Sequence, residues 1–286
     1  MATILLTGAN GTVTAPTIAA LKSSGHRLIG LVRDEAKGKA LDIELRKGDL
    51  DQPRSIEGAF DGVDTAWLLS APGPLQPYQM SNAIWAARQA GVRHIVRMSA
   101  VGAAHDAPTV NSRLHAISDE ELKASGIAYT IFKPHMFMQT FLWTAEGIAK
   151  EGVFAFAFGD AAVPVIDVAD IAAAAASVLD NPRPHVGKTY TLTGPAAVTG
   201  QQMGAAIGEA IGKPVKYLPI PVPTMVDGIA KMGLGDYVEV AVRDYLNAYS
   251  RGWSSQVTDA VRKLTGKTPR TVAEFARENA AAFGKR

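Results

Sequence analysis

Hydrophobic residues in the first half of the chain form short, nearly continuous runs, separated by longer stretches with helical periodicity. Such runs are typical of strands that are buried on both faces of a parallel sheet. We predict strands over residues 3–7, 27–32, 43–47, 64–70, 93–99 and 128–133, and helices over residues 13–24, 53–60, 76–90 and 110–125. Gly25, Gly62, Gly91 and Gly126 each precede a predicted strand, where a left-handed residue commonly ends a helix. The alternation predicts an α/β fold with a doubly wound parallel sheet.

The pattern becomes less regular after about residue 134. Helices are predicted over residues 136–150, 168–179 and 199–211, and strands over residues 153–158, 188–193 and 215–220. Pro219, Pro221 and Pro223 predict a stiff extended connection, and the remainder reads as mostly helical. We therefore predict a domain over residues 1–150, its sheet completed by later segments, and a smaller C-terminal α/β lobe, mostly helical, over residues 151–286.

Composition excludes several classes of protein. Hydrophobic residues make up 47% and charged residues 20%, so a large core can form. A net charge of +2 argues against capture of nucleic acid or of an anionic membrane surface. The absence of cysteine excludes thiolate chemistry and is compatible with a cytoplasmic location, which we expect. The N-terminus reads as a strand and no segment makes a good transmembrane helix, so we expect no membrane partner. We expect a monomer or a homodimer.

The most informative motif is the glycine-containing turn after the first predicted strand. It reads Thr7-Gly8-Ala9-Asn10-Gly11-Thr12-Val13-Thr14. Gly8 suits a tight turn, and Gly11 lets the backbone approach a pyrophosphate that free amides of the following helix bind. The third position is Thr14 where the usual motif has a small residue. This context predicts a Rossmann-type dinucleotide site formed by Gly8, Asn10, Gly11, Thr12 and Val13.

Two further strand ends bear on the adenosine half of the dinucleotide. Arg33 follows the second strand, where an arginine binds the 2′-phosphate of NADP and an acid would favour NAD. Asp34, one residue later, competes for the ribose, and Arg33 alternatively is only a solvated side chain. Asp49 and Leu50 follow the third strand, so Asp49 either meets the adenine or caps the helix predicted at residue 53.

Several segments together resemble one family. They are Thr7-Gly8-Ala9-Asn10-Gly11, Leu31-Val32-Arg33, Gly48-Asp49-Leu50, Thr130-Ile131-Phe132-Lys133-Pro134, Gly187-Lys188-Thr189-Tyr190-Thr191-Leu192-Thr193-Gly194-Pro195 and Thr265-Gly266-Lys267-Thr268-Pro269-Arg270-Thr271. The chain resembles the NmrA-like, atypical branch of the short-chain dehydrogenases/reductases, and within it the type 2 NAD(P)H:quinone oxidoreductases and triphenylmethane reductases. The resemblance implies NADPH, with NADH possible, and hydride transfer to quinones or dyes. It also implies that some members only sense the dinucleotide.

Typical short-chain dehydrogenases use a Ser and a Tyr-x-x-x-Lys pair, in which Tyr donates a proton. Here His115 stands at the Tyr position and Asp119 at the Lys position, so alcohol–ketone chemistry is not expected. His115 either polarises or protonates a substrate oxygen or is a hydrogen-bonded wall residue. Ser99, after the fifth strand, either touches nicotinamide or substrate or caps a turn. His115 and Ser99 are our candidate catalytic residues.

The remaining candidates also follow strands. We expect Ser70, Ala71 and Pro72 to line the cofactor, together with Lys133, Pro134 and Met136, whose main chain would meet the carboxamide. Candidate substrate-binding residues for a flat acceptor are His135, Phe137, Met138, Phe141, Trp143 and Tyr245. We expect about half of these side chains to be core instead.

No metal cluster, nucleophile elbow or Walker-type loop fits the spacing. The sequence therefore predicts an NADPH-dependent reductase of a flat, electron-poor acceptor such as a quinone or cationic dye. Two alternatives remain: a non-catalytic NADP(H)-binding redox sensor that regulates a protein partner, and an epimerase or dehydratase of the extended branch.

Overall fold

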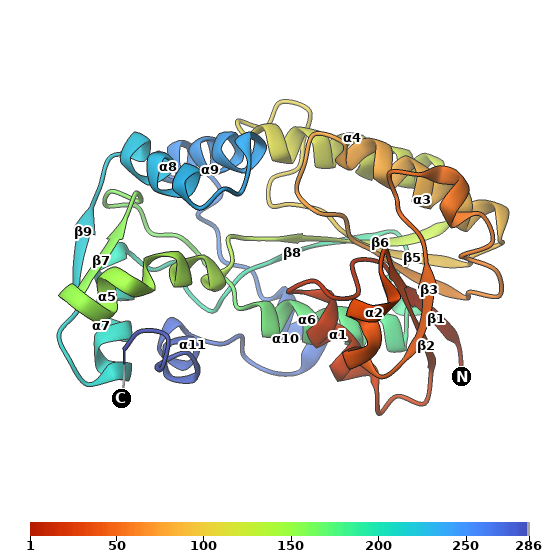
Figure 1. The fold of residues 1–286 in the computed structure, drawn as a ribbon, viewed down its shortest axis with the longest axis horizontal. Coiled ribbons are helices and arrows are strands. Elements are labelled where there is room, and N and C mark those ends of the chain that lie inside the picture. The colour runs from red at the N-terminus through yellow and green to blue at the C-terminus, as the bar shows by residue number, and fades with distance from the viewer. Residues whose placement is uncertain (285–286) are drawn as a thin grey trace. The chain divides into compact units, whose positions relative to one another are not determined.

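The computed structural model describes residues 1–284, and these residues form two compact units. The first unit contains residues 1–107, 111–134 and 171–191, and the second contains residues 108–110, 135–170 and 192 onward. The division therefore differs from the boundary predicted at residue 150. Residues 135–150 leave the sheet and pack in the second unit, whereas residues 171–191 return to the first unit (Figure 1).

A seven-stranded sheet with the order β3-β2-β1-β4-β5-β6-β8 is the framework of the first unit. Its strands are β1 (Thr3–Leu6), β2 (Arg27–Val32), β3 (Glu44–Lys47), β4 (Thr65–Leu68), β5 (His94–Met98), β6 (Ala128–Pro134) and β8 (Lys188–Leu192). The pairs β1–β2, β1–β4, β2–β3, β4–β5 and β5–β6 are parallel, which confirms the predicted doubly wound sheet. From β1 the chain adds β2 and β3 on one side of the sheet, and from β4 it adds the later strands on the other side. The switch point therefore lies between β1 and β4, and ligands of such sheets bind beyond the carboxyl ends of the strands there.

Helices cover both faces of this sheet. They are α1 (Thr14–Leu21), α2 (Glu35–Gly38), α3 (Gln76–Gln89), α4 (Val110–Ala124) and α6 (Val168–Asp180), with single 3-10 turns η1 (Lys39–Leu41), η2 (Pro53–Ile56) and η4 (Arg183–His185). Figure 1 shows α3 and α4 on one side of the strands and α1 and α6 on the other. Met80, Ala83 and Leu122 from α3 and α4 are buried with Leu5, Ile29 and Ile95 of the strands in one hydrophobic core.

Thr14 connects the first helix to the sheet in an unexpected way. Its buried hydroxyl donates to the Thr7 carbonyl oxygen (3.1 Å) and accepts from the indole Nε1 of Trp67 on β4 (3.0 Å). The Thr14 hydroxyl both donates and accepts a hydrogen bond, so α1 can approach the sheet closely although Thr14 is larger than the residue expected there. The departure from the usual motif therefore leaves the turn intact.

In the loops and short helices, one prediction was wrong, one of two alternatives for Asp49 is excluded, and one short helix was missed. The helix predicted over residues 53–60 is only η2, whose N-cap is Gln52, so Asp49 does not cap it. Asp49 instead accepts from the Asp51 amide (3.0 Å) in a local turn. The sequence reading also missed α2, which begins after Asp34 because the Asp34 carboxylate accepts from the Ala36 amide (2.9 Å).

The second unit combines a small sheet with helices. Its elements are the 3-10 segment η3 (Met138–Thr144), α5 (Ala145–Glu151), β7 (Val153–Phe156), α7 (Gly200–Ile211), β9 (Lys216–Pro219), α8 (Val222–Lys231), α9 (Asp236–Tyr249), α10 (Ala260–Thr265) and α11 (Val272–Glu278). Strands β7 and β9 pair in parallel. The helix predicted over residues 199–211 is α7: Thr199 caps it in a capping box and Gly212 ends it in a left-handed conformation.

Two predictions in this unit need correction. The helix predicted over residues 136–150 is regular only in α5, because η3 precedes it. The extended connection predicted from Pro219, Pro221 and Pro223 ends earlier than expected: Pro219 is the last residue of β9 and Pro221 is extended, but a helix begins at Val222. Pro221 is the N-cap of α8 and Pro223 lies in its first turn, where the missing amide hydrogen does not interrupt the helix hydrogen bonds.

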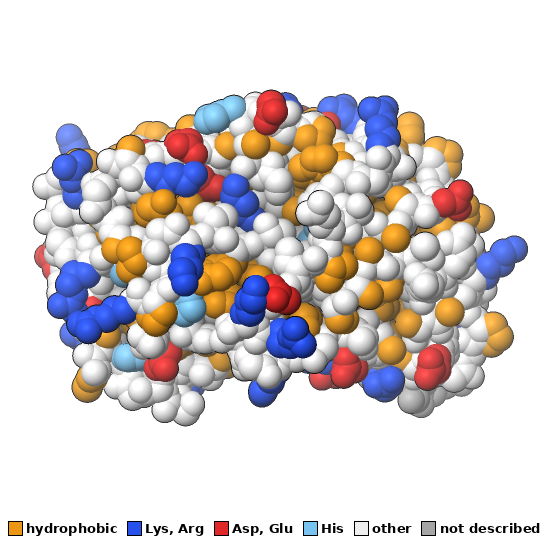
Figure 2. Space-filling view, turned by 180° about the vertical axis from the view of Figure 1, so that it is seen from behind, with side chains coloured by type: hydrophobic (Ala, Val, Ile, Leu, Met, Phe, Trp, Pro, Cys, Tyr) orange, Lys and Arg blue, Asp and Glu red, His pale blue; other side chains and the backbone are white. Residues whose placement is uncertain are grey.

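Among the described residues, no helix has both the length and the apolar content that a membrane crossing requires. Figure 2 shows acidic and basic side chains interspersed with apolar ones on one face of the molecule, in keeping with the small net charge of +2.

Replacing Thr14 tests the double role of its hydroxyl. Thr14→Val keeps the volume but leaves the indole hydrogen of Trp67 without an acceptor, so unfolding in urea should require about 1–3 kcal/mol less free energy. Thr17→Val is the matched control, because the buried Thr17 hydroxyl only donates back to Val13 in the same helix. Equal stability of the two variants would contradict the assignment.

Candidate functional site

Most candidate residues of the first unit lie at the carboxyl ends of parallel strands. Thr7 follows β1, Arg33 follows β2, Ser70 lies just beyond β4, and Ser99 follows β5. Lys133 is the residue before the last in β6. Since the strands are parallel, these ends lie along one edge of the sheet, and the sequence-predicted residues are brought together there.

The turn after β1 has the geometry of a phosphate site. Gly8 adopts φ +61°, and the Gly11 amide donates to its carbonyl oxygen (2.7 Å). A Cβ atom at Gly11 would lie 2.9 Å from that same oxygen, so the turn requires glycine. The amides of Thr12 and Val13 donate to no acceptor among residues 1–284 and stand at the N-terminus of α1. This arrangement fits the pyrophosphate of a dinucleotide, because free amides and the helix dipole both attract it.

The two charged residues after β2 have different tasks. Arg33 is exposed and forms no ion pair or hydrogen bond with any residue that the structure describes. The Asp34 carboxylate is already occupied as the N-cap of α2. An arginine whose donors are all available beside an engaged carboxylate fits a 2′-phosphate better than a free ribose diol.

Other cofactor candidates differ in how far their polar groups are engaged. Asp49 donates its amide to the Ser55 hydroxyl (2.8 Å), and the Leu50 carbonyl accepts from the Asn82 amide group (2.8 Å), so this loop is fixed by its neighbours. Ser70 is partly exposed, and Ala71 and Pro72 are exposed. They remain candidates for the cofactor loop.

A buried ion pair lies beneath the ends of β5 and β6. Arg97 on β5 has no exposed surface, and Asp119 on α4 has 1%. The guanidinium Nη1 of Arg97 pairs with Oδ1 of Asp119. In the amide orientation that suits its neighbours, Gln76 accepts from Nη2 of Arg97 at 2.8 Å. Burial lowers the pKa of Arg97, and the neighbouring charge of Asp119 opposes that shift.

Asp119 also organises two predicted site residues. The Ser99 hydroxyl donates to Oδ2 of Asp119 (2.8 Å). The Lys133 ammonium lies 3.6 Å from the same oxygen and donates to the Ala103 carbonyl oxygen (2.7 Å). Ser99 therefore does more than cap a turn. Lys133 places a cation beside Asp119, which occupies the position of the lysine in the Tyr-x-x-x-Lys motif. Counting Arg97, Lys133 and Asp119, the cluster carries a net charge of +1.

His115 joins this cluster. Its Nδ1 lies 3.1 Å from Nη2 of Arg97. Although His115 keeps some exposed surface, burial of the ring lowers its pKa well below the usual value, and the positive charges of Arg97 and Lys133 lower it further. The imidazole is therefore neutral near pH 7.

The main chain after β6 is less open than predicted. The carbonyl oxygen of Pro134 accepts from the Val101 amide (3.1 Å), in the first unit. In the second unit, the Met136 amide donates to the His135 ring (2.8 Å) and the Met136 oxygen accepts from the Ile166 amide (2.9 Å). The Met136 amide is therefore engaged, whereas each of the two carbonyl oxygens keeps a second lone pair, and contact of this main chain with a carboxamide stays a prediction.

His135 is a structural residue rather than a substrate contact. It is 2% exposed, stacks on Tyr249 with a centroid separation of 4.9 Å, and directs Nε2 to the Ser254 carbonyl oxygen (3.1 Å). Its Nδ1 accepts from the Met136 amide, so both ring nitrogens are engaged. Burial lowers the pKa of His135 to about 4.

The predicted acceptor residues divide into core and partly exposed side chains. Met138 and Phe141 lie in the hydrophobic core of the second unit, with exposed fractions of 1% and 0%, and with buried His135 they make up the half that was expected to be core. Phe137, Trp143 and Tyr245 keep part of their surface open. The structure thus leaves only these three of the six substrate candidates able to meet a ligand through the side chain.

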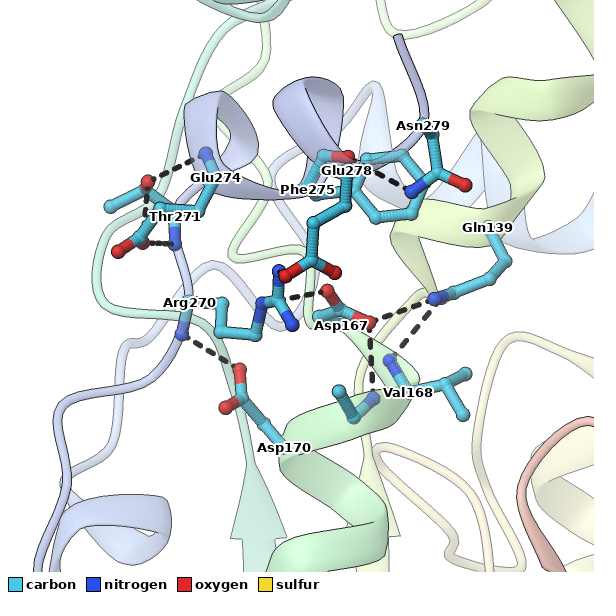
Figure 3. Close-up of polar contacts among 11 residues, drawn as sticks. Gln139, Asp167, Val168, Asp170, Arg270, Thr271, Glu274, Phe275, Glu278 and Asn279 are labelled. Carbon is cyan, nitrogen blue, oxygen red and sulfur yellow. Dashed lines mark hydrogen bonds and ion pairs between the residues drawn. The ribbon is translucent and has the colours of Figure 1, made fainter. Parts of the chain in front are cut away.

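Arg270, in the late family segment, has a structural task (Figure 3). Its Nε lies 3.1 Å from Oδ2 of buried Asp167, its Nη2 pairs with Glu278, and its amide donates to Asp170 (2.8 Å). Chiefly because of burial, the pKa of Asp170 rises to about 6. The segment holds α11 against the start of α6 within the second unit and adds no group to the first-unit cluster.

The sequence reading overlooked Arg97 as a site residue and Asp119 as the hub of the cluster. An arginine inside the apolar strand His94–Met98 was the available signal. A buried guanidinium requires an acidic partner, and the acid at the position of the usual lysine was a ready candidate. Gln76 carried no such signal, since its contact depends on how α3 begins.

The sheet, the glycine turn and the neighbouring arginine define a dinucleotide-binding protein of the Rossmann type. The chain belongs to the NAD(P)H-binding family, whose sequence profile matches residues 8–182, and to its NmrA-like branch of atypical short-chain dehydrogenases/reductases.

Three relatives support this assignment. The chain is 34% identical to the NAD(P)H azoreductase of Xenophilus azovorans, over 98% of this chain and 99% of that protein. The NADPH complex of a quinone oxidoreductase from Escherichia coli superposes with a TM-score of 0.87, at 29% identity, covering 96% and 99% of the two chains. The NADP(H) complex of a Citrobacter triphenylmethane reductase gives 0.86, at 25% identity, covering 97% and 99%.

Removing the hub of the cluster should destabilise the fold. Asp119→Ala leaves the Arg97 guanidinium buried without its counter-ion, which should lower the free energy of unfolding by about 3–5 kcal/mol. Urea denaturation measures this. The matched control is Glu120→Ala, because Glu120 is exposed and pairs only with Lys123 on the same helix. A loss for Asp119→Ala no larger than for the control would show that the ion pair is not structural.

Proposed function

We propose that this protein is an NADPH-dependent reductase that delivers a hydride to a flat, electron-poor acceptor such as a quinone or a cationic dye. When bound, NADPH supplies the hydride, and the protein binds and orients both partners. The relatives that resemble this chain over its whole length include NAD(P)H-dependent reductases. The choice of acceptor and the preference for NADPH are our inferences.

One observation carries the choice of acceptor. The cluster of Arg97, Asp119 and Lys133 has no tyrosine–lysine pair that could protonate an alkoxide, because His115 and Asp119 occupy the two positions. A ketone needs such a proton, whereas a quinone or a carbocationic dye forms a stable product without one. The site therefore suits acceptors that are electron-poor before reaction.

Within the second unit, aromatic side chains offer a stacking surface to a flat molecule. Tyr245 stacks on Tyr249 with centroids 5.6 Å apart, and Trp253 stacks on Tyr249 at 6.0 Å. Tyr245 and Trp253 are partly exposed, so a flat ring system has aromatic faces on which to stack. The relatives named for azo compounds, quinones and triphenylmethane dyes act on conjugated molecules of this kind.

The preference for NADPH is inferred from Arg33 and Asp34. Arg33 has all its donors available, and Asp34 is held by the Ala36 amide. Bidentate contacts with a phosphate exploit the planar guanidinium, and Oδ1 of Asp34 already accepts from the Ala36 amide.

Purified protein should oxidise NADPH in the presence of at least one class of conjugated acceptor. The test follows the nicotinamide absorbance with a panel of quinones, azo dyes and triphenylmethane dyes, and uses saturated ketones as the control. Turnover of the ketones alone would contradict the proposal. Tight binding of NADPH without turnover over the whole panel would instead establish a dinucleotide sensor.

Arg33→Ala should separate the two nicotinamide cofactors. Loss of charge-assisted hydrogen bonds to the 2′-phosphate should weaken NADPH binding about 10- to 100-fold and leave NADH within about threefold. Calorimetric titration measures both dissociation constants. Arg93→Ala, at the other end of a strand, should change neither, because Arg93 pairs with Asp64 away from the glycine turn. Equal losses for both cofactors in Arg33→Ala would refute the 2′-phosphate assignment.

A further inference from the structure

The hydrogen-bond directions around His115 are determined by Arg97. A guanidinium has five N–H donors and no acceptor. Nη2 of Arg97 lies 3.1 Å from Nδ1 of His115, so Nδ1 must offer its lone pair. A neutral imidazole has one hydrogen, and it therefore sits on Nε2. The only polar hydrogen that His115 can present elsewhere is Nε2–H.

The direction of the hydrogen bond made by the Ser99 hydroxyl is also determined. It donates to Oδ2 of Asp119 at 2.8 Å, and an ionised carboxylate is an acceptor only. Ser99 thus presents lone pairs, not a hydrogen, to a ligand. Neither of the two residues predicted to be catalytic holds a proton that it can release as an acid.

Arg97 cannot easily turn away from His115. Nη1 is held by Asp119, and Nη2 has its second hydrogen directed to Gln76. The whole side chain is buried, and Nε has no partner among the described residues, so the guanidinium already falls short of full hydrogen bonding. Rotating it would break further bonds away from water.

We propose that His115 assists hydride transfer as a neutral hydrogen-bond donor through Nε2–H, and that Arg97 is the positioning residue that fixes this tautomer. This inference rests on the proposed function and sharpens it. The substrate atom that meets His115 is an oxygen or nitrogen that gains negative charge as the hydride arrives. The proton that completes the product comes from water.

The electron and proton count agrees with this role. A quinone that gains a hydride at its conjugated system becomes a hydroquinone monoanion, and no group leaves. The anion then takes one proton from water to give the hydroquinone. During the first step, Nε2–H stabilises the oxygen that becomes negative, as a fixed donor in a poorly solvated site does. The cluster's net charge of +1, set by Lys133, acts in the same direction.

The charged surroundings oppose an imidazolium at this position. The groups that face the ring are Arg97 from β5 and Lys133 from β6, both positive, and both lower the pKa of His115 in addition to burial. Asp119 of α4 does not reverse this effect, because its carboxylate pairs with those same two cations. His115 should stay neutral through the range of pH in which a free histidine titrates.

Nitrogen-15 NMR of the imidazoles tests the tautomer without any turnover. The His115 signals, identified by their loss in His115→Gln, should show a protonated Nε2 and an unprotonated Nδ1 from pH 5.5 to 8 (a range that brackets the ordinary histidine pKa of about 6.5). A protonated Nδ1, or an imidazolium that titrates in this range, would overturn the proposal.

Kinetics with a quinone and NADPH tests the role in the reaction. His115→Gln retains an oxygen that accepts from Arg97 and an amide that donates, so kcat should stay within about threefold of the parent protein. His115→Leu lacks both and should lose about tenfold or more in kcat, with little change in NADPH affinity. His105→Gln is the control, because His105 is exposed and lies outside the cluster. Equal kcat values for His115→Leu and the parent, or inactive His115→Gln, would contradict the inference.

The pH profile and the solvent isotope effect separate a donor from an acid. With a neutral donor, kcat is flat from pH 5.5 to 8 and the rate in D2O nearly equals that in H2O, because no enzyme proton moves with the hydride. An acid would give a kcat that falls as pH rises through its pKa. A parent protein that binds NADPH but reduces nothing would refute the proposed function as well. If the parent protein reduces the quinone but its kcat falls as pH rises, only the proposed role of His115 is refuted.

The positioning role of Arg97 has its own test. In Arg97→Met/Asp119→Leu both charges disappear together, so neither is left buried alone, and such replacements are often tolerated. His115 in this variant should populate both neutral tautomers in the NMR spectrum. An unchanged single tautomer would show that Arg97 does not set it. The His115→Gln result does not depend on this variant, so a failure of the double variant to fold leaves that test intact.

Discussion

A guanidinium that is shielded from water must be neutralised and hydrogen-bonded, and this constraint on Arg97 shapes the whole site. Asp119 neutralises it, Gln76 and His115 accept from Nη2, and the second carboxylate oxygen of Asp119 then accepts from Ser99 and attracts Lys133. Three elements, β5, α4 and β6, are therefore linked at the edge of the sheet where ligands bind. Because partly satisfied buried networks are costly, each member restricts the orientation of the next.

The cluster reverses the charge arrangement of the typical short-chain dehydrogenase. There, a lysine on the helix assists a tyrosine that gives up a proton. Here the helix carries the acid Asp119, and the cation Lys133 comes from a strand, so a positive charge remains near the site although no acid–base pair does. What the protein retains is a fixed electrostatic environment and hydrogen-bond donors. Such a site lowers the barrier for reactions that build negative charge and do little for reactions that require a proton at the same moment.

Much of this could be predicted from the sequence, since the signals were local. The glycine turn, the apolar strands and the glycines that end helices identify the sheet and the phosphate site before any contact is known. The failures depended on contacts that local patterns do not contain. Pro221 and Pro223 read as an extended connection, although proline is also well suited to a helix start. Local patterns also could not separate Met138 and Phe141, which lie in the core of the second unit, from the acceptor candidates that keep exposed surface. Ser99 follows β5 and His115 lies on α4, but the direction of each hydrogen bond depends on a partner from another element: Asp119 of α4 for Ser99, and Arg97 of β5 for His115.

Thr14 illustrates why a motif should be read as a set of physical requirements. Close packing of the first helix on the first strand is what the usual small residue provides. A threonine satisfies the same requirement because Thr7 and Trp67 take up both functions of its hydroxyl, so the larger side chain is bonded rather than crowded. The same reasoning applies to His115 and Asp119. They differ from the residues of the typical dehydrogenase site, and the hydrogen-bond directions that they impose are the basis on which we propose a different kind of acceptor. The identity of a residue therefore suggests a reaction, whereas the direction of its hydrogen bonds decides which reactions the site can assist.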